Sequence, residues 1–127
     1  MLFPRLKPTI QLILVVQAIC MLLGTYTHVA WTVRHGFLYP DVPIYSRLFW
    51  DSLTFLDPLA ALLLFLRPRA GVILVATIIL VDVLHNVFIG YLFDPYVLLQ
   101  VLFGIFVWVT LRLNLRDIRR AVKLYLE

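Results

Sequence analysis

Four long apolar stretches fill most of this 127-residue chain, and their length is the feature that most constrains its fold. An α-helix of about 20 apolar residues, rising about 1.5 Å per residue, crosses a hydrocarbon layer about 30 Å thick. With 63% hydrophobic and 14% charged residues, the composition excludes an ordinary soluble domain. We expect an all-α, polytopic membrane protein, a bundle of four transmembrane helices near residues 9–34, 48–66, 71–92 and 95–112.

Short polar segments mark where the helices end. The segment from Arg67 to Gly71 predicts a tight turn in which its proline and its glycine break the helix. Asp94 and Pro95 predict the start of the fourth helix, with Asp94 as its N-cap and Pro95 at the first helical position. These short connections leave no room for a second domain, so residues 1–127 are expected to form a single transmembrane domain.

Basic residues are unevenly distributed between the two sides of the expected bundle. One side holds Arg5, Lys7, Arg67, Arg69, Arg112, Arg116, Arg119, Arg120 and Lys123, and the other holds Arg34 and Arg47. Lys and Arg are enriched in cytoplasmic loops, so both termini are predicted to be cytoplasmic, in a bacterial inner membrane or an equivalent one. Because the basic residues flank apolar spans, the net charge of +4 reflects topology, and no nucleic-acid partner is expected.

The C-terminal segment, residues 112–127, carries basic residues at helical spacing and is predicted to be amphipathic. One interpretation places it along the anionic inner leaflet of the lipid bilayer. A solvated tail that only fixes the topology, or a helix that binds a partner, fits the same pattern.

Polar side chains within the apolar spans form the pattern that bears most directly on function. An ionisable group in hydrocarbon usually faces the bundle interior or a cavity and marks a functional site. Helical spacing places several of these groups on shared faces of the first three spans. The candidate ligand-binding residues are His28, Trp31, Asp51, Thr54, Asp57, Asp82, His85 and Asn86.

The depth of two aspartates predicts a recess in the outer half of the bundle. Along their helices, Asp57 lies about 15 Å from Arg67, and Asp82 lies about 20 Å from Arg69. A charged carboxylate at that depth takes up a proton or finds a partner such as a histidine. Pro58 removes a backbone donor next to Asp57 and predicts a kink there. A ligand, ion or proton site and a purely structural hydrogen-bonded network both fit these positions.

Residues of these types can take part in several kinds of chemistry. No HxxxH or CxxC spacing is present, so no metal site is predicted. His28 and His85 together are compatible with axial ligation of a haem, and the sequence leaves the identity of any cofactor open. Paired aspartates also occur in membrane aspartic proteases, but the glycine-rich context of those enzymes is missing. Whether the chain is an enzyme is not decided by these residues.

Four short motifs follow one another between residues 24 and 90. They are Thr27-His28-Val29 late in the first span, the turn Leu38-Tyr39-Pro40, Asp51 ahead of Pro58 in the second span, and His85 in the third. In this order they resemble the four-helix EXPERA domain, a group that includes emopamil-binding sterol isomerases and their non-catalytic relatives.

This resemblance implies a membrane-embedded cavity for a lipophilic and often cationic ligand. Asp51 or Asp57 would contact the positive charge of the ligand, with His28 and His85 as polar neighbours. The second span contains no glutamate, and Asp82 has no clear counterpart, which leaves isomerase activity open.

The residues alone favour the same kind of ligand, because an apolar, aromatic pocket with a few acids suits an amphiphile or a cation. The first functional hypothesis is therefore an integral membrane protein that binds a lipophilic or cationic small molecule, or a lipid. The alternatives are an oligomeric proton- or cation-coupled transporter and an accessory subunit of a membrane complex. A homodimer is compatible with ligand binding, and transport by alternating access would require one.

Overall fold

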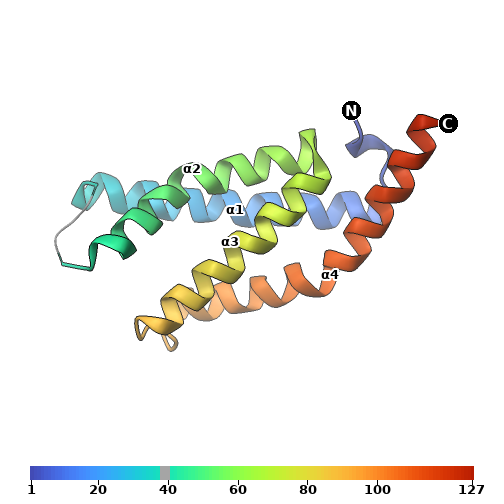
Figure 1. The fold of residues 1–127 in the computed structure, drawn as a ribbon. Helices are drawn as coiled ribbons and strands as arrows, with labels where there is room; N and C mark the ends of the chain where they lie inside the picture. The colour runs from blue at the N-terminus through green and yellow to red at the C-terminus, as the bar shows by residue number, and fades with distance from the viewer. Residues whose placement is uncertain (38–40) are drawn as a thin grey trace.

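A computed structural model describes residues 1–37 and 41–127 of the chain, and the regular elements in those ranges are helical. A short 3-10 helix, η1 (Phe3–Arg5), precedes four α-helices, α1 (Pro8–His35), α2 (Ile44–Leu66), α3 (Pro68–Phe88) and α4 (Pro95–Leu126) (Figure 1). All four α-helices are long and apolar enough to cross a membrane. The predicted all-α class with four apolar helices is confirmed, and it indicates a multi-pass membrane protein by length and composition.

Three of the four helices begin at a proline. Pro8, Pro68 and Pro95 are the first residues of α1, α3 and α4. A proline is favourable there because the first backbone N–H groups of a helix have no intrahelical acceptor. The predicted cap of α4 is confirmed, since Asp94 Oδ1 accepts a 2.8 Å hydrogen bond from the backbone N–H of Tyr96.

The end of α3 is set by Gly90. This residue has a φ of 94°, which is unfavourable for residues with a side chain. The N–H of Tyr91 donates to the carbonyl of Asn86 at 2.9 Å, and the N–H of Gly90 donates to the carbonyl of Val87 at 3.1 Å. This is a Schellman motif, and it ends α3 at Phe88 rather than at residue 92 as the sequence predicts.

Gly71 lies inside α3, so the prediction that it breaks the helix is wrong. The break between α2 and α3 is Arg67 alone, with φ −139° and ψ 74°. A Cβ atom on Gly71 would lie 2.5 Å from the backbone nitrogen of Leu64 and 2.7 Å from the carbonyl carbon of Leu63. The glycine therefore allows the first turn of α3 to pack directly on the backbone of α2.

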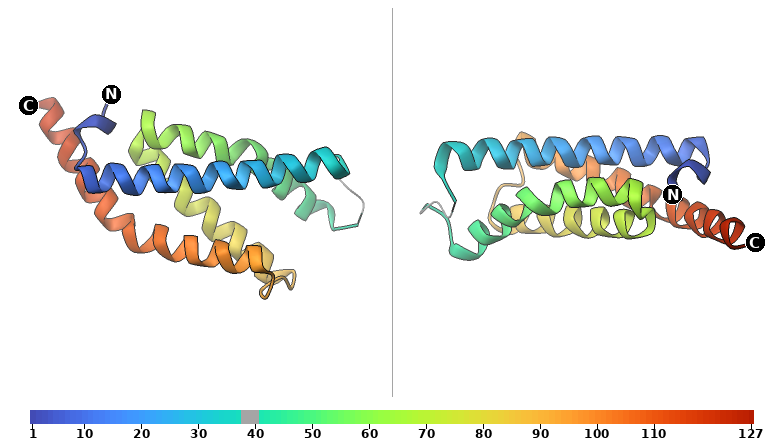
Figure 2. Two further views of the ribbon diagram at one scale, coloured as in Figure 1. Left: turned by 180° about the vertical axis from the view of Figure 1, so that it is seen from behind. Right: turned by 90° about the horizontal axis from the view of Figure 1, so that it is seen from above.

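Helix α2 continues through Pro58 and changes direction part-way along its length (Figures 1 and 2). Because Pro58 has no N–H, the carbonyl of Thr54 loses its normal intrahelical donor. The bend agrees with the kink predicted from the sequence.

Helices that are adjacent in sequence pack against each other, α1 on α2, α2 on α3 and α3 on α4. Both termini and the turn between α2 and α3 lie at one end of the bundle, which we call the basic end (Figure 1). Helices α1 and α4 come together there and diverge toward the opposite end, which we call the far end (Figure 2). Helices α1 and α4 are therefore closest to each other at the basic end.

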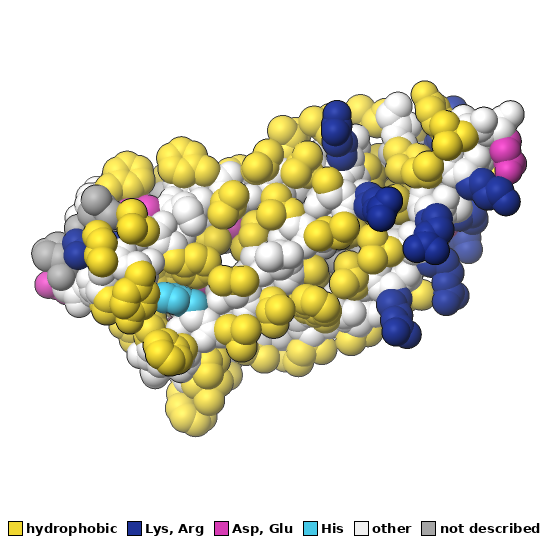
Figure 3. Space-filling model, viewed as in Figure 1, with side chains coloured by type: hydrophobic (Ala, Val, Ile, Leu, Met, Phe, Trp, Pro, Cys, Tyr) yellow, Lys and Arg dark blue, Asp and Glu magenta, His cyan; other side chains and the backbone are white. Residues whose placement is uncertain are grey.

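The outer surface of the bundle is largely apolar. Hydrophobic side chains cover most of the face shown in Figure 3, and most of its Lys and Arg side chains gather at the basic end. Large side chains such as Phe55 and Leu102, 67% and 63% exposed, point outward. Apolar exposure on this scale suits contact with lipid acyl chains.

Candidate functional site

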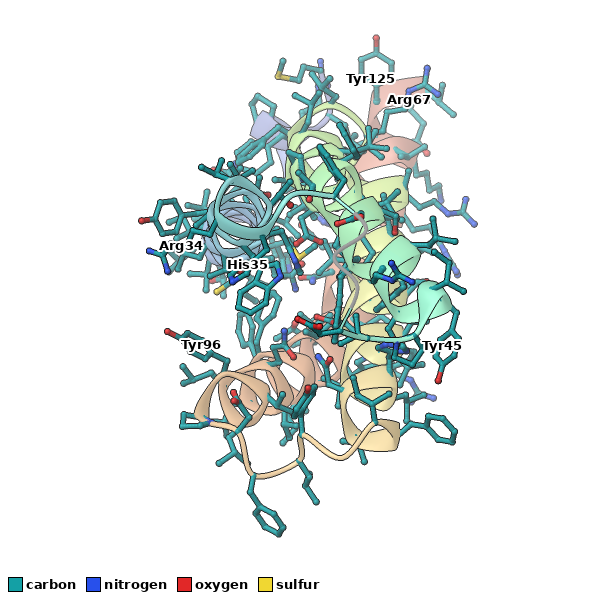
Figure 4. All side chains as sticks on the ribbon, turned by 90° about the vertical axis from the view of Figure 1, so that its left-hand side faces the viewer. Arg34, His35, Tyr45, Arg67, Tyr96 and Tyr125 are labelled. Atoms are coloured by element: carbon teal, nitrogen blue, oxygen red, sulfur yellow. The ribbon has the colours of Figure 1, made fainter. Side chains whose placement is uncertain are left out.

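A cavity of about 290 Å³ lies at the far end, between α1, α2 and the turn that connects α3 to α4. Figure 4 looks along the bundle from this end, with Arg34 and His35 on α1, Tyr45 on α2 and Tyr96 on α4. The lining side chains are Thr27, His28, Trp31, Thr32, Val42, Trp50, Asp51 and Tyr91. The cavity thus combines three aromatic rings with one imidazole and one carboxylate.

Three of the predicted site residues, His28, Trp31 and Asp51, line this cavity. Asp51 is close enough to His28 for its charge to act on the imidazole. The indole of Trp31 stacks on the imidazole of His35, with 3.9 Å between the ring centroids, and this contact helps to orient the Trp31 ring in the cavity wall. Tyr91 was not predicted, and the signal that points to it is Gly90, because the Schellman motif directs the chain after α3 back toward the bundle.

Next to the cavity, His28 is paired with Asp57 from α2. The distance from His28 Nε2 to Asp57 Oδ2 is 3.8 Å, which suits an ion pair but is too long for a hydrogen bond. A Cβ atom on Gly24 would lie 2.7 Å from the same Oδ2 atom, so the glycine makes room for the carboxylate between α1 and α2. Asp57 is 4% exposed, and its Oδ1 atom is buried without a hydrogen-bond partner.

Asp82, in contrast, belongs to a closed hydrogen-bonded network between α3 and α4. The Asn86 amide donates to Asp82 Oδ1 at 3.1 Å, and the Gln100 amide donates to Asp82 Oδ2 at 2.9 Å. Asn86 also donates to the carbonyl oxygen of the Gln100 side chain at 2.9 Å. Both carboxylate oxygens of Asp82 are therefore satisfied by neutral donors. Asp82 is close enough to Asp57 for a charge on one carboxylate to act on the other, which connects this network to the His28 side of the bundle.

His85 and Thr54 do not line the cavity described above. The imidazole of His85 lies among the rings of Tyr45, Phe49 and Trp50, at centroid distances of 6.2, 4.9 and 5.5 Å. Its Nε2 atom and the hydroxyl of Thr54 are buried without a hydrogen-bond partner. Trp50 contacts His85 and also lines the cavity, so it separates the two histidine environments.

A further buried polar group, which the sequence did not single out as a site, lies nearer the basic end. The Gln17 amide donates to the hydroxyl of Thr110 at 3.4 Å, which links α1 to α4. The carbonyl oxygen of Gln17 and both polar atoms of the Asn114 side chain are buried without partners. Polar groups therefore continue inside the bundle from the far end toward the basic end.

No known protein family, curated protein or solved structure matches this chain. Within residues 1–37 and 41–127, no group of three or more His, Cys, Asp or Glu side chains is placed to hold a metal ion. The Leu38-Tyr39-Pro40 motif of the EXPERA resemblance lies outside the described residues. What the geometry offers is an aromatic cavity with one acid at its wall and a second, incompletely satisfied acid behind the histidine.

Proposed function

We propose that this chain spans a membrane four times, with its basic end on the cytoplasmic side, and binds a lipophilic cation or cationic amphiphile in the far-end cavity. The observation that carries the proposal is the convergence of Trp31, Trp50, Tyr91 and Asp51 on one space of about 290 Å³. That volume is just below the range of about 300–1,000 Å³ for small-molecule sites. It suits a compact cationic group with an apolar tail extending into the bilayer.

The chemistry of the wall favours a positive charge. The faces of tryptophan and tyrosine rings attract cations, and a nearby carboxylate adds Coulombic attraction where water is scarce. Asp51 supplies that carboxylate at the cavity, and Asp57 lies behind His28 with one oxygen unsatisfied. The EXPERA resemblance, which assigns the cation contact to Asp51 or Asp57, is consistent with this arrangement and forms part of the proposal.

Binding of a lipophilic quaternary ammonium tests the proposal. We expect dodecyltrimethylammonium to bind protein in lipid nanodiscs saturably, above its partitioning into protein-free nanodiscs, and dodecanol to show no such component. Asp51→Asn should weaken the cation by about tenfold, equal to about 1.4 kcal/mol, because the cavity loses its wall charge. Glu127→Gln, which removes an exposed acid at the basic end, should leave the affinity unchanged. Equal affinity for the wild type and Asp51→Asn would refute the assignment.

One observation favours a second function, proton- or cation-coupled transport by an oligomer. The buried and unsatisfied polar atoms of Gln17 and Asn114 extend the polar interior beyond the His28–Asp57 pair. Chains of such groups are typical of ion and proton pathways through membranes. A transporter reconstituted in liposomes would collapse an imposed proton gradient, whereas a binding protein would leave the gradient intact.

A further inference from the structure

A second cavity, of about 320 Å³, lies at the basic end between the start of α1 and the last part of α4. Its lining side chains are Lys7, Thr9, Ile10, Ile13, Leu113, Arg116, Asp117 and Arg120. Residues 113, 116, 117 and 120 recur at helical spacing and share one face of α4. Three cationic side chains therefore surround this space, while Ile10, Ile13 and Leu113 give it an apolar wall.

The single carboxylate in this cavity is already neutralised by its neighbours. Asp117 Oδ2 accepts a 2.8 Å hydrogen bond from the backbone N–H of Lys7, and Asp117 Oδ1 accepts a 2.7 Å hydrogen bond from Arg120 Nε. Asp117 is 5% exposed, so it acts as a buried anchor that joins α4 to the start of α1 and orients the Arg120 guanidinium. The cavity keeps a net positive charge, since the ammonium of Lys7 and the guanidinium of Arg116 are not offset by a second acid among its lining residues.

The start of α1 adds to this positive potential. Helix α1 begins at Pro8, so the backbone N–H groups of Thr9 and Ile10 belong to its first turn and have no acceptor within the helix. Lys7, Thr9 and Ile10 line the cavity, so the partial positive charge at the N-terminus of this 28-residue helix lies beside the same space. Fixed N–H donors, two mobile cations and one oriented guanidinium together match a phosphate group.

We infer that this cavity binds one anionic phospholipid of the inner leaflet. The charge selects the phosphate headgroup, and the apolar wall of Ile13 and Leu113 offers a path for an acyl chain between α1 and α4. Basic pockets between membrane helices on the cytoplasmic side are suited to anionic headgroups. A free phosphate would gain the same charge contacts but none of the apolar ones. The inference rests on the proposed orientation of the bundle and is independent of ligand binding at the far end.

Native mass spectrometry of the intact chain in detergent, with phosphatidylglycerol and phosphatidylcholine supplied in equal amounts, tests this site. We expect one phosphatidylglycerol to be retained at low lipid concentration, with no comparable binding of phosphatidylcholine. The double variant Lys7→Gln/Arg116→Gln should weaken phosphatidylglycerol about tenfold to thirtyfold, because each basic residue contributes about 1 kcal/mol. These changes leave the backbone bond from Lys7 to Asp117 and the Arg120 pair in place.

The matched control is Arg112→Gln/Arg119→Gln, which removes two charges from α4 outside the cavity and should leave the affinity unchanged. Equal losses in the two double variants, or equal retention of both lipids, would overturn the site in favour of general attraction. Binding of inorganic phosphate at millimolar concentration, with no lipid retained, would overturn the lipid assignment. A photoactivatable phosphatidylglycerol on the wild-type chain gives an independent check that needs no variant. Its crosslinks should map to residues 9–13 and 113–120, and crosslinks elsewhere would contradict the inference.

Comparison with the nanodisc assay of cation binding separates this site from the far-end cavity. If the wild-type chain binds dodecyltrimethylammonium but no phosphatidylglycerol, only the lipid site is refuted. If it binds phosphatidylglycerol but no dodecyltrimethylammonium, the proposed function is refuted and the lipid site is not.

Discussion

Replacement of Gly71 by valine is expected to abolish most of the folded protein. The first side-chain atom at this position would lie 2.5–2.7 Å from backbone atoms of Leu63 and Leu64, and a backbone cannot move aside as a flexible side chain can. Overpacking of this kind costs on the order of 3 kcal/mol or more when the backbone has to shift. The measurement is the fraction of monodisperse protein in detergent, together with its unfolding midpoint in sodium dodecyl sulfate.

Gly104 provides the matched control for this prediction. A Cβ atom on Gly104 would lie 3.4 Å from the Cγ1 atom of Ile79, which is a side-chain carbon and not part of the backbone. Gly104→Ala is therefore expected to change stability by less than about 1 kcal/mol, in either direction, since alanine is also the better helix former. A Gly71→Val variant as stable as Gly104→Ala would show that α2 and α3 do not pack as described.

The two deeply placed aspartates are expected to behave differently on substitution. Asp82 accepts from two amides, so Asp82→Leu removes one acceptor from the Asn86 amide and the acceptor of the Gln100 amide, while Asn86 keeps its bond to Gln100. The expected loss of stability is about 1–3 kcal/mol. Asp57 satisfies no donor of this kind and keeps one buried oxygen without a partner, so Asp57→Asn should leave the unfolding midpoint unchanged. The variant Asp57→Asn should instead bind dodecyltrimethylammonium more weakly than the wild type does.

Both effects are measured on the same preparations, by unfolding in sodium dodecyl sulfate and by the nanodisc binding assay. If Asp57→Asn binds the cation as tightly as the wild type does, then of the two acids only Asp51 contributes to binding. Unfolding of Asp57→Asn to the same extent as Asp82→Leu would show that the two carboxylates form a single structural network.

Much of the fold follows from the sequence because the membrane restricts what an apolar chain can do. The number of helices, the cap at Asp94 and the bend at Pro58 all follow from run length, capping preference and the missing N–H of proline. The role of Gly71 did not follow, because a glycine at a turn and a glycine at a close helix contact look alike in a sequence. Its role depends on how α3 crosses α2.

The composition of the site was less predictable for the same reason. Spacing places Asp82 and Asn86 on one face of α3, but it does not show that Gln100 of α4 completes their hydrogen bonding. It also does not show that Trp50 separates His85 from the cavity lined by His28. These relations depend on how different helices cross, whereas helical spacing in a sequence describes only one helix at a time.

The location of the bound cation is measured most directly by tryptophan fluorescence. Trp31 and Trp50 line the far-end cavity, whereas Trp108 on α4 does not, although Trp31 and Trp108 are similarly exposed at 48% and 47%. The wild-type chain and Trp108→Phe, which keeps both cavity tryptophans, are titrated in nanodiscs with a brominated lipophilic quaternary ammonium. Saturable quenching with the same midpoint is predicted for both proteins, and their difference, the quenching of Trp108, should rise only linearly as the cation partitions into the bilayer. Linear quenching of Trp108→Phe would show that the cation dissolves in the lipid and does not occupy the cavity.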